Sequence, residues 1–137
     1  MRHMLKNNFS KEERLHKKRH IDQLFTSKQA FTIYPYRVIY QFEPPTDNKP
    51  AERAACLISV AKKRFKRAVA RNRLKRLTRE AYRLNKSPLC KVLEERDLTL
   101  HFALIAICDD LPSFARCQKA MKQVVSKLSE RAISYGK

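Results

Sequence analysis

The sequence predicts a single domain of the α+β class, an α/β sandwich in which three helices pack against a mixed central sheet of three to four strands. The chain has 137 residues, of which 43% are hydrophobic, which is enough for one core. Runs rich in β-branched and aromatic residues alternate with segments of helical periodicity. The expected order is therefore helix, strand, strand, helix, strand, helix, within a domain over residues 10–132 and with flexible ends at residues 1–9 and 133–137.

The first helix is expected to begin near Ser10, because Ser10 and Glu13 have the spacing of a capping box, and to end by about Ser27. His16 and His20 are four residues apart in this helix and could approach one metal ion. No third ligand is evident in the sequence, so we assign no metal site.

Three segments are predicted to be strands: residues 31–42, 54–61 and 98–108. Pro35 lies near the start of the first, where a strand tolerates proline. Side chains of that strand alternate between faces, and one face is predicted to hold Tyr36, Val38, Tyr40 and Phe42. The last strand is almost continuously apolar, which predicts burial on both faces. A fourth, short strand within residues 37–55 is an open alternative.

The most informative segment is a helix predicted from about Lys66 or Arg67 to about Asn85, with Pro88 marking its end. Its apolar stripe is Ala70, Leu74, Leu77, Ala81 and Leu84. Its opposite face carries Asn72, Arg76, Arg79 and Arg83, flanked by Lys75. Only one acid, Glu80, lies among these cations, although like charges three or four residues apart repel each other. Residues 89–97 are ambiguous, and a final helix with Ser113 as N-cap is predicted over residues 114–129.

The charge balance predicts a polyanionic partner. Lys and Arg number 31 and Asp and Glu number 13, a formal net charge of +18. A solvated basic face is the ordinary explanation for a charge run, but several turns of Arg on one helix face favour a nucleic-acid surface. Guanidinium groups bind phosphate with two parallel hydrogen bonds and also stack on bases.

Composition excludes several classes of function. The only glycine is Gly136, so neither a Walker-type loop nor a GxGxxG turn can form. The four cysteines include no CxxC pair, which argues against a zinc ribbon or a redox pair. Acidic residues form no cluster suited to two catalytic metal ions. With no signal peptide and no apolar run of membrane-spanning length, we expect a cytoplasmic protein.

The run AKK-x4-AV-x-RNR-x-KR-x2-RE, which begins at Ala61, resembles the signature of the bacterial ribonuclease P protein family. The resemblance implies a ribosomal-protein-S5-domain-2-like fold with a left-handed strand–helix–strand crossover. It also implies a subunit, monomeric in a 1:1 ribonucleoprotein, that binds the catalytic ribonuclease P RNA and the 5′ leader of precursor tRNA. In this family the RNA performs the cleavage with Mg²⁺ held mainly by RNA, so no catalytic residue is expected in the protein.

Individual roles follow from the resemblance. Contacts with the catalytic RNA are expected from Lys62, Lys66, Arg67, Arg71, Asn72, Arg73, Lys75, Arg76, Arg79 and Arg83. Contacts with the leader are expected from Ile21, Phe25, Tyr40, Ser59 and Lys63. Ile21 stands where the family often has an aromatic residue, which reduces its expected role to apolar contact. Core packing is the alternative for Phe25 and Tyr40, and either Arg71 or Arg73 could instead bind Glu80 or a loop carbonyl. A general basic RNA-binding or ribosome-associated protein without processing activity also fits the composition.

Overall fold

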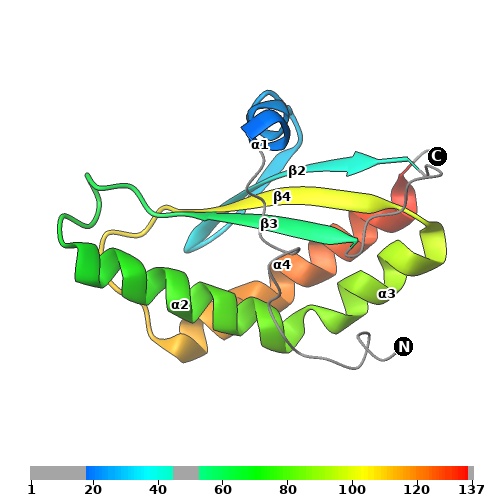
Figure 1. Ribbon diagram of the computed structural model, residues 1–137. Helices are drawn as coiled ribbons and strands as arrows, with labels where there is room; N and C mark the ends of the chain where they lie inside the picture. Colours follow the sequence, from blue (N-terminus) through cyan, green and yellow to red (C-terminus); the bar gives the residue numbers. More distant parts are fainter. Residues whose placement is uncertain (1–17, 45–52, 136–137) are drawn as a thin grey trace.

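The computed structural model describes residues 18–44 and 53–135 and shows one sheet with helices on both faces (Figure 1). The strands are β1 (Ala30–Ile33), β2 (Tyr36–Glu43), β3 (Ala54–Ser59) and β4 (Thr99–Ala106). The helices are α1 (Lys18–Phe25), α2 (Ala68–Asn85), α3 (Ser87–Arg96) and α4 (Phe114–Ser134). The α+β class and the mixed sheet are confirmed. The Ser10 capping box and His16 lie outside the described residues.

The centre of the sheet is β4, and the strand order is β1-β2-β4-β3. β4 pairs antiparallel with β2 and parallel with β3, and both of its faces are buried as its apolar sequence predicted. The parallel strands β3 and β4 are joined through α2 and α3. The left-handed sense of this crossover stays a prediction.

The fourth strand is not where the sequence suggested. The segment predicted as one strand over residues 31–42 is a hairpin, in which β1 pairs antiparallel with β2. The chain turns at Tyr34 and Pro35, which are joined by a cis peptide bond. Proline therefore marks a turn between two strands here, because it cannot donate a ladder hydrogen bond within one.

Helix α2 ends at Asn85 as predicted, but Pro88 begins another helix instead of closing a loop. Pro88 lies in the first turn of α3, where its missing N–H leaves no intrahelical bond unmade. α3 ends at Asp97, which adopts the left-handed conformation (φ 55°) and donates its N–H to carbonyls of the last turn. The ambiguous residues 89–97 thus form most of a helix, and the described chain has four helices in place of three.

Helix α4 begins as predicted, with the Ser113 hydroxyl accepting a 3.1 Å hydrogen bond from the Arg116 N–H. It ends at Ser134, five residues beyond the predicted end, and the next residue, Tyr135, packs its ring against Phe42 with centroids 5.7 Å apart. Residues 133–135 therefore belong to the folded domain, contrary to the predicted flexible C-terminus.

The two faces of the sheet are covered unequally. In Figure 1, the described helices α2, α3 and α4 lie on one side of the sheet and α1 lies on the other. The larger core lies under the three helices and includes the predicted face Tyr36, Val38, Tyr40 and Phe42. The smaller core lies under α1 and is centred on Leu24, Ile39 and Ala103. Within residues 18–44 and 53–135, the eight residues of α1 cover only part of this side of the sheet. None of the described helices is long and apolar enough to cross a membrane.

Candidate nucleic-acid interface

The loop between β3 and α2, residues 60–67, presents the first group of cations. Lys62, Lys63, Lys66 and Arg67 are all exposed. Phe65 is 7% exposed and packs in the main core, so its side chain fixes the loop to the body of the domain. Arg64, in contrast, is held by the protein itself: its Nη1 donates hydrogen bonds to the carbonyl of Ile107 and to the Asp109 carboxylate, each at 3.0 Å. Together these contacts hold the loop while its other cations face solvent.

Arg71 reaches back from the first turns of α2 to the loop that precedes it. Its Nη1 donates to the carbonyls of Phe65 at 2.8 Å and Lys66 at 2.9 Å, and the side chain is half-buried. This matches the alternative in which an arginine of the motif binds a loop carbonyl. Arg71 therefore shapes the basic loop, and its five donors leave part of the guanidinium for another partner.

The exposed face of α2 carries the second group of cations. Asn72, Arg73 and Arg76 are exposed, and Lys75, Arg79 and Arg83 are half-buried. The buried stripe is rotated slightly from its predicted position: Leu74, Thr78, Ala81 and Tyr82 are buried, whereas Leu84 is 42% exposed. The Tyr82 ring packs on Phe102 of β4, which gives the helix a bulky contact that the apolar stripe did not include.

The single acid of this face is neutralised locally. Glu80 Oε1 lies 2.5 Å from Arg83 Nη2, and Oε2 accepts a second hydrogen bond from Arg83 Nε at 3.2 Å. These bonds lower the pKa of Glu80 and raise the pKa of Arg83. The pair leaves Arg83 with less capacity for a phosphate than Arg73 or Arg76, which lie two to three turns earlier.

The N-terminus of α2 adds a further attraction for anions. Its N-cap, Arg67, makes no capping hydrogen bond with its side chain, and the first turn contains no acid. The free amides and the helix dipole favour negative charge there. They lie beside the exposed cations of the loop, so the loop and the N-terminal half of α2 form one positive end of the molecule.

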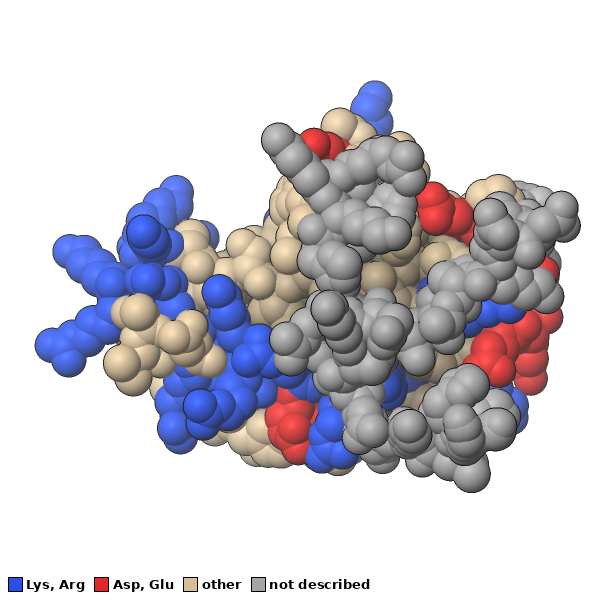
Figure 2. Space-filling model, in the orientation of Figure 1, with Lys and Arg blue, Asp and Glu red and all other residues tan. Residues whose placement is uncertain are grey.

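Charge is segregated along the molecule. Figure 2 shows Lys and Arg gathered over the loop after β3 and along α2, and acidic residues gathered at the opposite end, near the end of α3. Glu94 and Glu95 of α3 are exposed there. We call residues 62–76 of this positive region the basic end. A polyanion is steered towards it and away from the α3 end.

A second candidate surface lies on the α1 side of the sheet. Phe25 is 47% exposed at the end of α1, and Ile21 is half-buried against the smaller core. Ser59 ends β3 on the same side of the sheet, and Lys63 follows it in the basic loop. Four of the five residues predicted to contact a leader are therefore on or next to this partly covered face.

Arg37 is a basic residue of this face that the site prediction left out. It is exposed, it pairs with Ile105 of β4, and Ile105 in turn pairs with Ser59. The three residues form a row across the sheet at the end nearest the basic loop. The strand alternation that set Arg37 opposite Tyr36 was the available signal, but only pairing across three strands aligns it with Ser59.

Tyr40 corrects the site prediction. It is 2% exposed and packs in the larger core, with its ring 5.8 Å from Phe31 and 5.7 Å from Phe42. The strand alternation that makes Tyr40 share a face with Tyr36 turns it away from α1. We therefore remove Tyr40 from the candidate surface and retain Phe25.

No metal centre is evident in the part of the chain that the structure describes, where no three His, Cys, Asp or Glu residues are grouped so as to hold an ion. None of the four cysteines forms a disulfide, and burial raises the pKa of Cys108 and of Cys117. Buried thiols with raised pKa values are poor nucleophiles. The chemistry that this arrangement offers is electrostatic and stacking contact with a polyanion.

Comparisons with known proteins agree with this description. A family model described as Ribonuclease P matches residues 9–129. The ribonuclease P protein component of Porphyromonas gingivalis is 43% identical over 120 residues, which cover 88% of this chain and 85% of the relative. That of Chlorobaculum tepidum is 35% identical over 97 residues, covering 66% and 63%. The structure of the Staphylococcus aureus RNase P protein superposes with a TM-score of 0.62 at 22% identity, covering 84% of this chain and 94% of that one.

Proposed function

Because the chain belongs to the ribonuclease P protein family, we propose that it binds the catalytic ribonuclease P RNA and the 5′ leader of precursor tRNA. In this proposal it assists the RNA-catalysed endonucleolytic cut that produces the mature 5′ end of tRNA. The observation that carries the proposal is the basic end: exposed cations of one loop and one helix, held on a rigid core. Such an array suits the phosphates of a folded RNA.

The contact with the catalytic RNA is assigned to the basic end. Asn72, Arg73 and Arg76 are exposed, and Lys75, Arg79 and Arg83 extend the same surface in half-buried positions. Lys62, Lys66 and Arg67 approach the RNA from the preceding loop. Arg71 acts mainly as a positioning residue, because its guanidinium already binds two loop carbonyls.

The contact with the leader is assigned to the α1 side of the sheet. Single-stranded RNA is bound by cations that follow its backbone and by flat or apolar side chains beneath its bases. Phe25 supplies an exposed ring, Ile21 an apolar contact, and Ser59 a hydroxyl. Arg37, at the end of the sheet nearest the basic end, and Lys63, within the basic end itself, supply the charges.

The chemical step is assigned to the RNA partner, with Mg²⁺ held mainly by RNA phosphates. A positively charged surface binds those phosphates and repels free cations, so the protein is suited to positioning RNA and substrate. The partner set is then one ribonuclease P RNA and one precursor tRNA per protein monomer, in the cytoplasm. A general RNA-binding protein without processing activity is less favoured, since the family match extends over residues 9–129 and not only over the basic helix.

Reconstitution tests the proposal. The purified protein and a bacterial ribonuclease P RNA are mixed at low Mg²⁺ concentration, and release of the 5′ leader from precursor tRNA is followed on a gel. We expect cleavage with both components and none with protein alone. Cleavage by protein alone would overturn the assignment of chemistry to RNA, and no effect of the protein on the RNA would overturn the processing role.

A matched pair of variants tests the leader surface. Phe25→Ala should weaken binding of precursor tRNA relative to mature tRNA, while assembly with the catalytic RNA is retained. Ile133→Ala is the control, because Ile133 has the same 47% exposure but lies on α4. An equal loss for precursor and mature tRNA in Phe25→Ala would refute a leader contact.

A further inference from the structure

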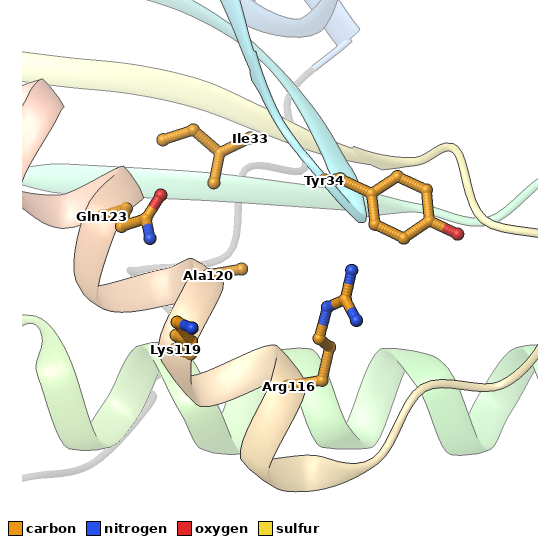
Figure 3. Close-up of a pocket in the computed structure, with 6 residues that line it drawn as sticks. All are labelled: Ile33, Tyr34, Arg116, Lys119, Ala120 and Gln123. Carbon is orange, nitrogen blue, oxygen red and sulfur yellow. The ribbon is translucent and has the colours of Figure 1, made fainter.

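A pocket of about 350 Å³ lies on the side of the sheet that α2, α3 and α4 cover, between the β1–β2 turn and α4 (Figure 3). It is lined by Ile33, Tyr34, Arg116, Lys119, Ala120 and Gln123. Its size is within the range of small-ligand sites. It includes none of the residues assigned to the catalytic RNA or to the leader.

The lining combines an exposed aromatic ring with cations. Tyr34 is 52% exposed, and the Arg116 guanidinium carbon lies 5.3 Å from the centroid of its ring. Figure 3 shows the guanidinium extending from α4 towards that ring. Lys119 adds a second positive charge and Gln123 adds an amide, while none of the six lining residues is acidic. This is the set of groups with which proteins bind an unstacked nucleotide: planar surfaces for the base, a cation for the phosphate and an amide for the base edge.

The same pattern continues along α4. Lys127, one turn after Gln123, places its ammonium 5.5 Å from the centroid of the Phe31 ring on β1. Arg116, Lys119, Gln123 and Lys127 recur at intervals of three or four residues and therefore follow one side of the helix. That side carries three positive charges beside the aromatic residues of β1 and its turn.

Hydrogen bonds join the turn that carries Tyr34 to the basic end. The carbonyl of Pro35 accepts a 2.9 Å bond from the Ile107 N–H, and the carbonyl of Ile107 accepts the 3.0 Å bond from Arg64. Arg64 belongs to the basic loop. The pocket therefore lies at the same end of the sheet as the basic end, within reach of an RNA strand that passes around it.

We propose that this pocket binds one unstacked nucleotide of single-stranded RNA. The base extends the stack formed by Tyr34 and Arg116, Lys119 binds the adjoining phosphate, and Gln123 hydrogen-bonds the base edge. The inference goes beyond the proposed function, because it gives the chain a third RNA contact on the face opposite Phe25. The nucleotide could belong to the catalytic RNA or to the precursor tRNA, which share this chemistry.

Crosslinking and affinity measurements test the pocket with the full chain. Each RNA is made with 4-thiouridine and irradiated with the protein separately, and crosslinked peptides are identified by mass spectrometry. We expect a crosslink to the peptide containing Tyr34 or Arg116 with one of the two RNAs, which identifies the source. Tyr34→Ala and Arg116→Ala should each weaken binding of that RNA by about fivefold or more, as expected when a base loses its stacking partner.

Controls separate stacking from charge and from misfolding. Tyr34→Phe keeps the ring and should retain binding, whereas Arg131→Ala removes an exposed arginine of α4 outside the pocket and should change affinity little. Thermal melting of every variant checks folding. Arg116→Ala tests the pocket from α4 without changing the sequence of the β1–β2 turn. Unchanged affinity for both RNAs in Tyr34→Ala and Arg116→Ala, or equal losses in Tyr34→Phe and Tyr34→Ala, would overturn the proposal. The test of the leader surface with Phe25→Ala is independent of this one, so either the leader contact or the pocket contact can be refuted while the other stands.

Discussion

Removing two exposed arginines of α2 should weaken RNA binding in a salt-dependent way without unfolding the protein. Arg73 and Arg76 are exposed, and no described hydrogen bond or ion pair holds their guanidiniums. Replacing both with Ala should change the free energy of unfolding by no more than about 0.5 kcal/mol each, since exposed helix positions tolerate substitution and Ala favours helix. Their loss therefore reports on RNA contact.

The size of the effect follows from counterion release. Each phosphate contact contributes about 0.7–0.9 to the slope of log affinity against log salt. If each arginine binds one phosphate, the double variant should lose about 1.4–1.8 of that slope. If the two salt titrations meet near 1 M, as expected when electrostatic binding vanishes there, the affinity at about 0.1 M should fall roughly 25- to 60-fold.

The assay is a filter-binding or fluorescence titration of ribonuclease P RNA from about 0.1 to 1 M monovalent salt. The matched control removes two exposed cations elsewhere, Lys91 of α3 and Arg131 of α4, and so changes net charge equally. We expect the control to keep nearly the full slope. An equal loss of slope in both double variants would show that net charge, and not the face of α2, determines binding.

Three further predictions follow from individual contacts. Glu80→Gln removes the only acid of the α2 face and its ion pair with Arg83, so affinity for the RNA should rise a few-fold in the same titration; a decrease would show that the pair positions Arg83 for binding. Thr78→Val leaves the Tyr36 hydroxyl without its 2.8 Å partner in the core and should lower the free energy of unfolding by about 1–3 kcal/mol in urea denaturation. Adding Tyr36→Phe should recover part of that loss, and a simple sum of two losses would contradict the pairing. Burial raises the pKa of Cys117, so the stability contributed by its neutral thiol is fully present below about pH 8.5 and is lost as the pH rises above that value. Cys117→Ala should reduce this loss of stability at high pH, and an identical pH dependence in the variant would show that Cys117 is not its cause.

The predictable parts of the fold are those controlled by local periodicity. β4 was recognised from its unbroken apolar run, α2 from its 3.6-residue repeat, and the start of α4 from Ser113. The β1–β2 hairpin was missed because the strand-forming residues before and after Pro35 read as one run. The extent of α3 was missed because its hydrophobic pattern is weak, and it is stabilised by burying Leu89 and Leu93 in the main core.

The candidate site likewise has a part that local sequence patterns predict and a part that only tertiary packing determines. Apart from Arg64, the cations of the basic end are predicted from sequence, since charge, helical spacing and the motif lie within one continuous segment. Tyr40 was misplaced and Arg37 was overlooked, because the face of a strand that meets solvent depends on which helices cover the sheet. The pocket at Tyr34 joins residues more than eighty positions apart, and no local pattern relates them.

The sequence by itself determined the fold class, the positive charge and the helix that concentrates it, because composition and short-range periodicity are properties of neighbouring residues. Only the tertiary structure decided which side chains share a surface. Packing three helices on one face of the sheet buries Tyr40, leaves Phe25 exposed on the other, and brings Tyr34 against Arg116. These outcomes depend on burial between distant segments, where the apolar area removed from water determines which face each residue occupies.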